Sequence, residues 1–375
     1  MVDLALKMLL HDKLKFFITV AGVAFAVTLV LVQVGLFLGL LDNATVTIDN
    51  TNADLWVTSK ETPNIDFAHL FPESMINRVR STPGVARAEN LLVSFQTISL
   101  PNGAQEGVLI YGLDSFRDWN LPWNVPQGKL EDLKRGPYFF LDDSAVRRYG
   151  RFKVGEYREI QQNRLQIIGR TADAKSFTTT PIAFMDFDRV QALSPDLLRG
   201  QTSYILVKLV PGADANAIQA ELQRRLPYND VLLKQDWANH SRDYWIVSTG
   251  LGLNLFVTVF LGCLVGVVIV AQTLYSSTME HIKEFGTVKA IGGGNGVIYR
   301  LLAEQATMSA AAGYVLGVLM AFLVQPLISK IDLKLMIPNS FLVAVFFGSL
   351  VMCLGAAMIS FRKVAGIDPA LVFRS

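Results

Sequence analysis

The chain has 375 residues, of which 51% are hydrophobic and only 18% are charged, and its formal net charge is +2. Soluble proteins usually carry about 25% charged residues, and nucleic-acid-binding proteins carry clustered Lys and Arg, so this composition argues against both classes. The charges are also segregated. Residues 42–243 hold 23 Lys and Arg and 25 Asp and Glu, whereas the other 173 residues hold 11 and 7.

Residues 1–15 form a basic arm before the first apolar run. Asp3, Lys7, His11 and Lys15 recur every four residues, and leucines fill much of the remainder. This spacing predicts an interfacial amphipathic helix that lies in the headgroup plane and contacts membrane lipid.

Four stretches without charge, residues 16–41, 246–279, 305–329 and 335–361, are long enough to cross a membrane, since about 20 apolar residues suffice. Lys and Arg flank them in the arm, between spans two and three, and in the tail. Because cytoplasmic loops are enriched in these residues, we expect an inner-membrane protein with both termini cytoplasmic. The predicted divisions are 1–15 (interfacial helix), 16–41 (span one), 42–245 (periplasmic domain), 246–275 (span two), 276–300 (cytoplasmic coupling helix and turn), 303–329 (span three), 330–338 (external loop), 339–361 (span four) and 362–375 (cytoplasmic tail).

The region between spans one and two alternates strand and helix signals. Strands are predicted at residues 53–59, 85–100, 107–113, 204–210 and 230–234, and helices at 72–80 and 213–226. These segments predict two β-α-β units in one α+β layer, interrupted at about 116–200 by an irregular β-rich insert. The expected fold class is an α-helical membrane protein with four transmembrane helices and a large α+β extracytoplasmic domain.

The polar region shows no catalytic pattern. His69 and His240 stand alone without metal-ligand spacing, and the pair Asp142–Asp143 is expected to be a solvated turn. The sequence has no G-x-x-x-x-G-K-[ST] loop. We therefore expect no catalytic, cofactor or metal site, and no ATP hydrolysis by this chain alone.

The second span is unusually long. Tyr244 and Trp245 mark its outer end and Tyr275 its inner end, in the manner of the two aromatic belts of a membrane protein. The thirty residues from Trp245 to Tyr275 correspond to about 45 Å of helix. This length predicts a helix that runs straight out of the external domain as a rigid rod.

The segment after the second span, SSTMEHIKEFGTVKAIG at residues 276–292, is the most informative. Ser277 and Glu280 predict a capping box, and apolar residues recur on one face. A glycine inside a helix costs about 1 kcal/mol relative to alanine, so Gly286 indicates a bend or the close approach of a partner. The helix is either an ordinary interfacial connection or a docking element for a cytoplasmic motor. In the second interpretation the coupling residues are Glu284, Phe285, Gly286, Lys289 and Gly292.

The third span carries Gly313 and Gly317, four residues apart. This small-xxx-small spacing permits close helix approach. The approach is either between two copies of the chain or within one chain.

The segment E-F-G-T-V-K-A-I-G at residues 284–292 resembles the E-I-G-x-x-K/R-A-x-G motif of the MacB/FtsX family of ABC permeases. Residues 5–26 resemble the start of that family's first span, Glu304 matches its L-x-E pattern, and residues 367–370 resemble its tail motif. The order of one span, a large external domain and three spans also matches. Within the family, GVAFA and the segment 33–35 are most similar to DevC-type permeases of heterocyst-glycolipid exporters, and the chain has no fused ATPase domain.

The resemblance implies a homodimer that works with two separate cytoplasmic ABC ATPase subunits, so ATP is used through the partner and no cofactor is bound directly. ATP binding would move the coupling helices together, and the long second spans would carry that motion outward to the porter- and sabre-like external domain. A periplasmic adaptor and an outer-membrane channel are the implied further partners. The expected function is export of a lipid, glycolipid or other amphipathic substrate, because polar pathways through spans usually carry charges that these spans lack.

Other functions remain open within the same family. One is an FtsX-like regulator that activates a cell-wall hydrolase, and another is a permease that extracts lipoproteins or lipids. A neighbouring gene for an adaptor with a long helical hairpin would favour export, whereas a neighbouring peptidoglycan hydrolase would favour regulation.

Overall fold

A computed structural model describes residues 11–284, 287, 294–331 and 333–365. The chain divides into two compact units. One unit lies within Met1–Gly39 and Leu253–Ser375, and the other is Leu40–Gly252. We call them the membrane unit and the periplasmic unit.

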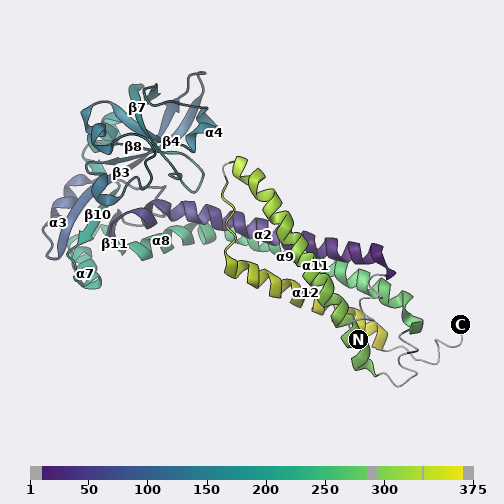
Figure 1. Ribbon diagram of the computed structural model, residues 1–375. Coiled ribbons are helices and arrows are strands. Elements are labelled where there is room, and N and C mark those ends of the chain that lie inside the picture. Colours follow the sequence, from purple (N-terminus) through teal and green to yellow (C-terminus); the bar gives the residue numbers. More distant parts are fainter. Residues whose placement is uncertain (1–10, 285–286, 288–293, 332, 366–375) are drawn as a thin grey trace. The chain divides into compact units, whose positions relative to one another are not determined.

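The membrane unit is built from long helices, drawn in Figure 1. They are α2 (Lys13–Asn50), α9 (Leu251–Glu280), α11 (Asn295–Lys330) and α12 (Asn339–Ala365). In the described part of the chain, these four helices are long and apolar enough to cross a membrane. Helices form here because a hydrocarbon core offers no water to the backbone, so each segment must satisfy its own hydrogen bonds.

Glycines of α9 and α11 pack against the helix α2. A Cβ atom added to Gly313 would lie 2.5 Å from Val23, and one added to Gly317 would lie 2.7 Å from Val27. Both contacts are too short for a real side chain, so α11 approaches α2 closely only because these positions are glycine. The two glycines thus face α2 of the same chain, and the homodimer stays a prediction.

The periplasmic unit combines strands with short helices. Its strands are β1 (Leu55–Ser59), β2 (Phe71–Pro72), β3 (Val85–Ser99), β4 (Gln105–Leu113), β5 (Tyr138–Asp142), β6 (Tyr157–Ile160), β7 (Asn163–Thr171), β8 (Ile182–Asp186), β9 (Gln201–Thr202), β10 (Tyr204–Leu209) and β11 (Asn229–Leu233). Its helices are α3 (Ile76–Arg80), α4 (Ala145–Tyr149), α5 (Phe187–Leu193), α6 (Pro195–Leu198), α7 (Ala215–Arg225) and α8 (Lys234–Asp243).

The two predicted β-α-β units are confirmed. The strands β1 and β3 flank β10, and β10 and β11 flank β1, so the sheet order is β11-β1-β10-β3 with antiparallel neighbours. The crossover helices α3 and α7 connect these pairs, as in a split β-α-β layer. Asp214 begins α7 as a cap, because its carboxylate accepts hydrogen bonds from the backbone N–H groups of Asn216 and Ala217.

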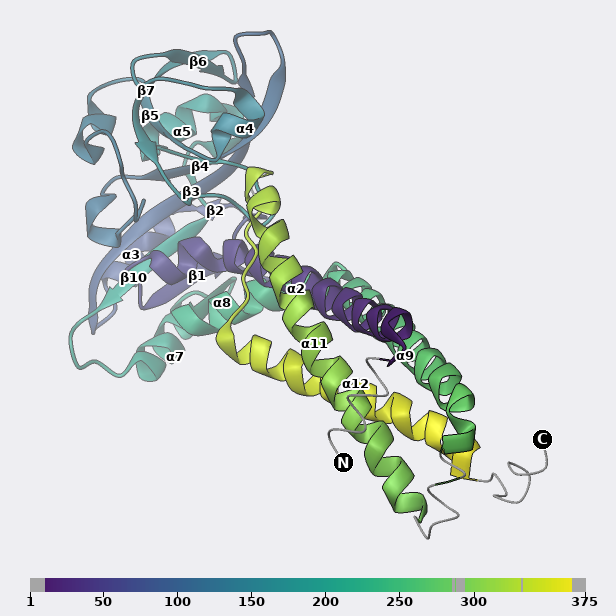
Figure 2. The ribbon, with the colours of Figure 1, turned by 45° about the vertical axis from the view of Figure 1, so that its right-hand side comes forward.

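The insert is more regular than its sequence suggests, because its strands extend the same sheet (Figure 2). After β3 the order continues β4-β8-β5-β7-β6, and β6 pairs back with β3 through Ile98 and Ile160. These six strands therefore close into a ring. The closure depends on the length of β3, which has 15 residues. Its first half pairs with β10 of the split β-α-β layer, and its second half pairs with β4 and β6 of the ring.

The last turns of α2 belong to the core of the periplasmic unit. Ile48 is fully buried and shares an apolar cluster with Trp56 and Trp237. Trp56 comes from β1 and Trp237 from α8. The end of α2 is therefore packed on two sides by the elements that follow it in the chain.

The expectation of a solvated turn at Asp142 is wrong. The Asp142 side chain is fully buried. Its carboxylate accepts hydrogen bonds from Ser144 N, Thr171 Oγ1 and Ala174 N, each at 2.9 Å. Burial raises the pKa of Asp142 to about 6 despite these bonds. The acid holds the loop after β7 against the end of β5, a tertiary role that local sequence does not reveal.

The straight rod predicted for the second span is also wrong. After α8 the chain forms a π-helical turn at Tyr244–Ser248, and Gly250 then adopts a φ of +71° before α9 begins at Leu251. This left-handed conformation suits glycine and interrupts the helix. Trp245 is only 6% exposed and stacks on Phe177 at 3.8 Å between ring centroids. It belongs to the packing of the periplasmic unit and not to an aromatic belt.

Candidate functional site

Charged residues gather where α2 begins and α9 ends. Lys15 near the start of α2 donates a hydrogen bond to the Glu280 carboxylate at the end of α9. The Lys15 ammonium also lies 3.3 Å from the carboxylate of Asp12. We call Asp12, Lys15, Glu280, His281 and Glu284 the helix-end cluster. It joins the predicted arm to the predicted coupling segment.

His281 extends the helix-end cluster from α9 into the segment that follows. Its Nδ1 atom hydrogen-bonds to the Glu284 carboxylate, and its Nε2 atom lies 4.0 Å from an oxygen of Asp12. The imidazole also meets the ring of His11 edge-on, with 6.3 Å between centroids. His281 is 9% exposed, so the start of the coupling segment packs against the arm.

A second connection joins α2 and α9 deeper in the membrane unit. Thr19 Oγ1 donates to Thr273 Oγ1 at 2.8 Å, and Thr273 Oγ1 in turn reaches the Ile269 carbonyl at 2.8 Å. Ser360 on α12 donates to the Ala271 carbonyl at 3.1 Å. Side-chain contacts therefore join α2 and α9 both at the helix ends and within the apolar seam.

The Lys15–Glu280 ion pair and the Thr19–Thr273 hydrogen bond differ in strength. The side chains of Lys15 and Glu280 are 24% and 57% exposed, and exposed ion pairs contribute about 0.2–1 kcal/mol. The Thr19 side chain is 4% exposed, and a buried neutral hydrogen bond contributes about 1 kcal/mol. The exposed ion pair thus holds the helix ends less firmly than the Thr19–Thr273 hydrogen bond holds the seam.

Of the predicted coupling residues, Glu284 belongs to the helix-end cluster. Its side chain bonds to His281 of the same chain and is still 63% exposed, so it can also meet a partner. Phe285, Gly286, Lys289 and Gly292 lie outside the described residues.

The predicted capping box is wrong, because α9 continues through Ser277 to Glu280. Thr278 Oγ1 donates to the Leu274 carbonyl at 2.6 Å, as inside a helix. Glu280 turns to Lys15 and not to the backbone of Ser277. The sequence S-x-x-E is present, but it lies inside α9 and not at the start of a helix.

Sequence reasoning missed Asp12 and His281 as partners, and it missed the link from Lys15 to Glu280. A signal was present. Asp12 and Lys15 precede the first uncharged stretch, and Glu280 directly follows the second. Opposite charges at the ends of two neighbouring spans on the same side are candidates for pairing, although the sequence does not show that the spans are neighbours.

The helix-end cluster brings basic and acidic side chains of the arm, α9 and the coupling segment together. Within the part of the chain that the structure describes, no three His, Cys, Asp or Glu side chains gather in a way that could hold a metal ion. Lys15 and His281 lie next to three carboxylates, those of Asp12, Glu280 and Glu284.

Two family descriptions match the chain. Residues 16–225 match the MacB-like periplasmic core domain, and residues 256–369 match the FtsX-like permease C-terminal region. An uncharacterised ABC transporter permease of Mycobacterium tuberculosis is 25% identical over 378 residues, which cover 100% of this chain and 99% of that relative. Another, of Mycobacterium bovis, is 25% identical over 354 residues, covering 94% and 93%.

Solved structures of periplasmic or extracellular regions are also similar. The periplasmic region of MacB from Actinobacillus actinomycetemcomitans is 12% identical with a TM-score of 0.40, and the similarity covers 50% of this chain and 92% of that one. The extracellular domain of the noncanonical ABC-type transporter YknZ from Gram-positive bacteria is 14% identical with a TM-score of 0.36, covering 49% and 100%.

Proposed function

This chain belongs to the MacB and FtsX family of ABC transporter permeases, and we propose that it is an export permease that passes ATPase motion to its periplasmic unit mainly through α2. An ABC permease works with a partner ATPase. The proposal concerns how the motion of that ATPase reaches the other side of the membrane, and what is exported.

The observation that carries the proposal is the continuity of α2. It runs as one helix from Lys13 to Asn50, about 57 Å at 1.5 Å per residue. Lys15 near one end belongs to the helix-end cluster, and Ile48 near the other end lies in the periplasmic core. The path through α9 is interrupted at Gly250, so we assign transmission to α2.

Within the periplasmic unit, α2 is tied to α8. Arg242 donates hydrogen bonds to Thr45 Oγ1 and Asp49 Oδ2, both at 2.8 Å. Lys234 donates to the carbonyl oxygens of Asp49 and Thr51, also at 2.8 Å. A movement of α2 would therefore carry α8, and with it the strand β11 that precedes α8.

The finer parts of the proposal rest on chemistry and on the family. The uncharged spans support an amphipathic cargo, a lipid or glycolipid, that does not cross between the spans as a hydrophilic solute. We propose a homodimer with two ATPase subunits, and a periplasmic adaptor leading to an outer-membrane channel. In this arrangement the ATPase binds the coupling segment at the exposed Glu284 and at Phe285, Gly286, Lys289 and Gly292.

The test uses the full-length chain with its ATPase subunit in lipid nanodiscs. Glu284→Lys and Gly286→Leu should abolish ATPase co-purification, or separate ATP turnover from export, while membrane insertion stays normal. Thr287→Ala, in the same segment, is the control and should behave like the wild type. Export is measured as amphipathic lipid released by cells that carry each variant. Wild-type export by both coupling variants would contradict the assignment.

A further inference from the structure

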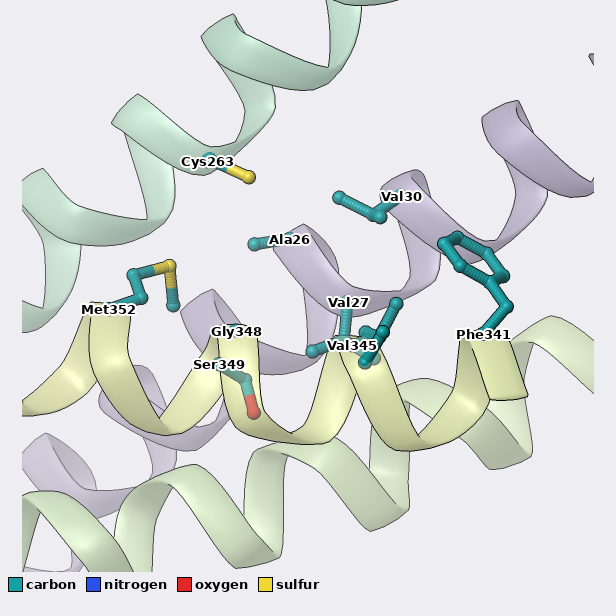
Figure 3. Close-up of a pocket in the computed structure, with 10 residues that line it drawn as sticks. Ala26, Val27, Val30, Cys263, Phe341, Val345, Gly348, Ser349 and Met352 are labelled. Atoms are coloured by element: carbon teal, nitrogen blue, oxygen red, sulfur yellow. The ribbon is translucent and has the colours of Figure 1, made fainter. Parts of the chain in front are cut away.

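A cavity of about 260 Å³ lies among α2, α9 and α12 within the membrane unit. Figure 3 shows its walls: Ala26 and Val30 come from α2, Cys263 comes from α9, and α12 contributes residues from Phe341 to Met352. All three helices are long and apolar enough to span the membrane. The cavity therefore lies among membrane-spanning segments, and we call it the α12 slot.

The α12 slot follows α12 over a long stretch. Its lining on α12 extends over eleven residue steps, from Phe341 to Met352, or about 16 Å along the helix. The lining therefore follows one face of α12 over about three turns. An extended hydrocarbon chain can lie along a face of this length.

The lining offers no partner to a polar ligand. The Ser349 hydroxyl donates to the Phe346 carbonyl of its own helix at 2.8 Å, and in Figure 3 it points away from Ala26 and Cys263. Apart from the weakly polar thiol of Cys263, the remaining lining side chains are apolar. A water molecule needs about two to four polar partners to occupy a cavity. The α12 slot is therefore suited only to an apolar occupant.

Two glycines that lie near the α12 slot differ in their surroundings. Gly266 of α9 is crowded, whereas Gly348 of α12 faces open space. A Cβ atom added to Gly266 of α9 would lie 2.9 Å from Ala26 and 3.1 Å from the Met352 sulfur, so the three helices converge there. A Cβ atom added to Gly348 of α12 would meet nothing within 4 Å. An unfilled space leaves its walls without attractive contacts. The medium that surrounds a span at this depth is the hydrocarbon of the bilayer.

From this geometry we propose that the α12 slot binds one acyl chain of a bilayer phospholipid. Its extent along α12 and its largely apolar lining match that chain, and bilayer hydrocarbon is the apolar material that surrounds the spans. The bound chain would fill the gap between α9 and α12 and keep the two helices apart. This proposal rests on insertion into the membrane and not on ATPase coupling, so the two can fail separately.

The test is lipid retention by the full-length chain extracted with a detergent-free polymer and analysed by native mass spectrometry. Gly348→Phe fills the α12 slot. Gly355→Phe is the matched control, because Gly355 lies on the same helix, also faces open space and does not line the slot. We expect one tightly held phospholipid per chain in the wild type and in Gly355→Phe, and at least a tenfold loss of occupancy in Gly348→Phe.

A second readout uses Cys263, which lines the slot and is half-buried. Removal of lipid from the wild type should speed its reaction with a small apolar maleimide several-fold, and Gly348→Phe should abolish that acceleration. Equal lipid retention in all three proteins would overturn the proposal. So would a retained molecule other than a phospholipid, or a loss of dimer mass in Gly348→Phe, which would mark the slot as a protein interface.

Discussion

Reversing one charge of the pair between Lys15 and Glu280 should uncouple the periplasmic unit from the ATPase. Lys15→Glu would place a carboxylate beside those of Asp12 and Glu280, the two acids that Lys15 now neutralises. The attraction that holds the start of α2 to the end of α9 would then be replaced by repulsion between carboxylates. Thr19 and Thr273 would still connect the helices deeper in the membrane unit, so the fold should persist.

The size of the free-energy change follows from the solvent exposure of the Lys15 and Glu280 side chains. With side chains 24% and 57% exposed, the attraction that is lost is about 0.2–1 kcal/mol. Two like charges at about 4 Å repel by about 1 kcal/mol in water and by about 4 kcal/mol at an effective dielectric constant of 20. The exposed Glu280 places this pair near the lower value. A total of about 1–2 kcal/mol changes the population of the paired arrangement by about 5- to 30-fold.

The assay is hydrogen–deuterium exchange of the complex in nanodiscs, with and without a non-hydrolysable ATP analogue. In the wild type we expect nucleotide to change exchange in residues 44–52 and 234–243. Lys15→Glu should reduce that change at least fivefold, and the double variant Lys15→Glu with Glu280→Lys should restore it. Lys13→Glu makes the same change of charge at an exposed position for which the described residues show no ion pair, and should have little effect. A full response in Lys15→Glu, or no recovery in the double variant, would refute the reasoning.

Three further predictions concern stability and topology. Burial raises the pKa of Asp142 from 3.8 to about 6, so the folded chain holds this proton more tightly than the unfolded chain does. The stability that this group contributes is therefore greatest below about pH 4, falls by on the order of 3 kcal/mol as the pH rises to about 6, and is constant above that. Urea unfolding followed by the periplasmic tryptophans should show this slope, and Asp142→Asn should flatten it; an unchanged slope would exclude Asp142 as its source. Gly39→Ala would bring a Cβ atom within 1.9 Å of the Lys334 carbonyl oxygen, so the melting temperature in detergent should fall by the equivalent of about 1–3 kcal/mol, whereas Gly355→Ala should leave it unchanged. Finally, an impermeant thiol reagent applied to intact cells should label Ser115→Cys and not Thr287→Cys; the reverse pattern would overturn the predicted orientation.

The helix-end cluster shows how far sequence reasoning reaches into the candidate site. Glu284 could be singled out because the motif around it is contiguous in the chain, and its role in coupling stays a prediction. The pairing of Lys15 with Glu280 joins residues that are 265 positions apart. Nothing local distinguishes Glu280 as a cap from Glu280 as an ion-pair partner, and only the packing of α9 on α2 settles the matter.

The sequence by itself determined the features that depend on a single segment. Four uncharged runs are enough to predict four spans, because exclusion of the backbone from water acts on each segment separately. The alternation of apolar residues was likewise enough for β1, β3, β10 and β11. The closure of the ring through Ile98 and Ile160, the burial of Asp142 and the stacking of Trp245 on Phe177 were decided only by the tertiary structure. Each of them joins segments whose adjacency follows from the summed packing of the whole unit, and no local pattern encodes that sum.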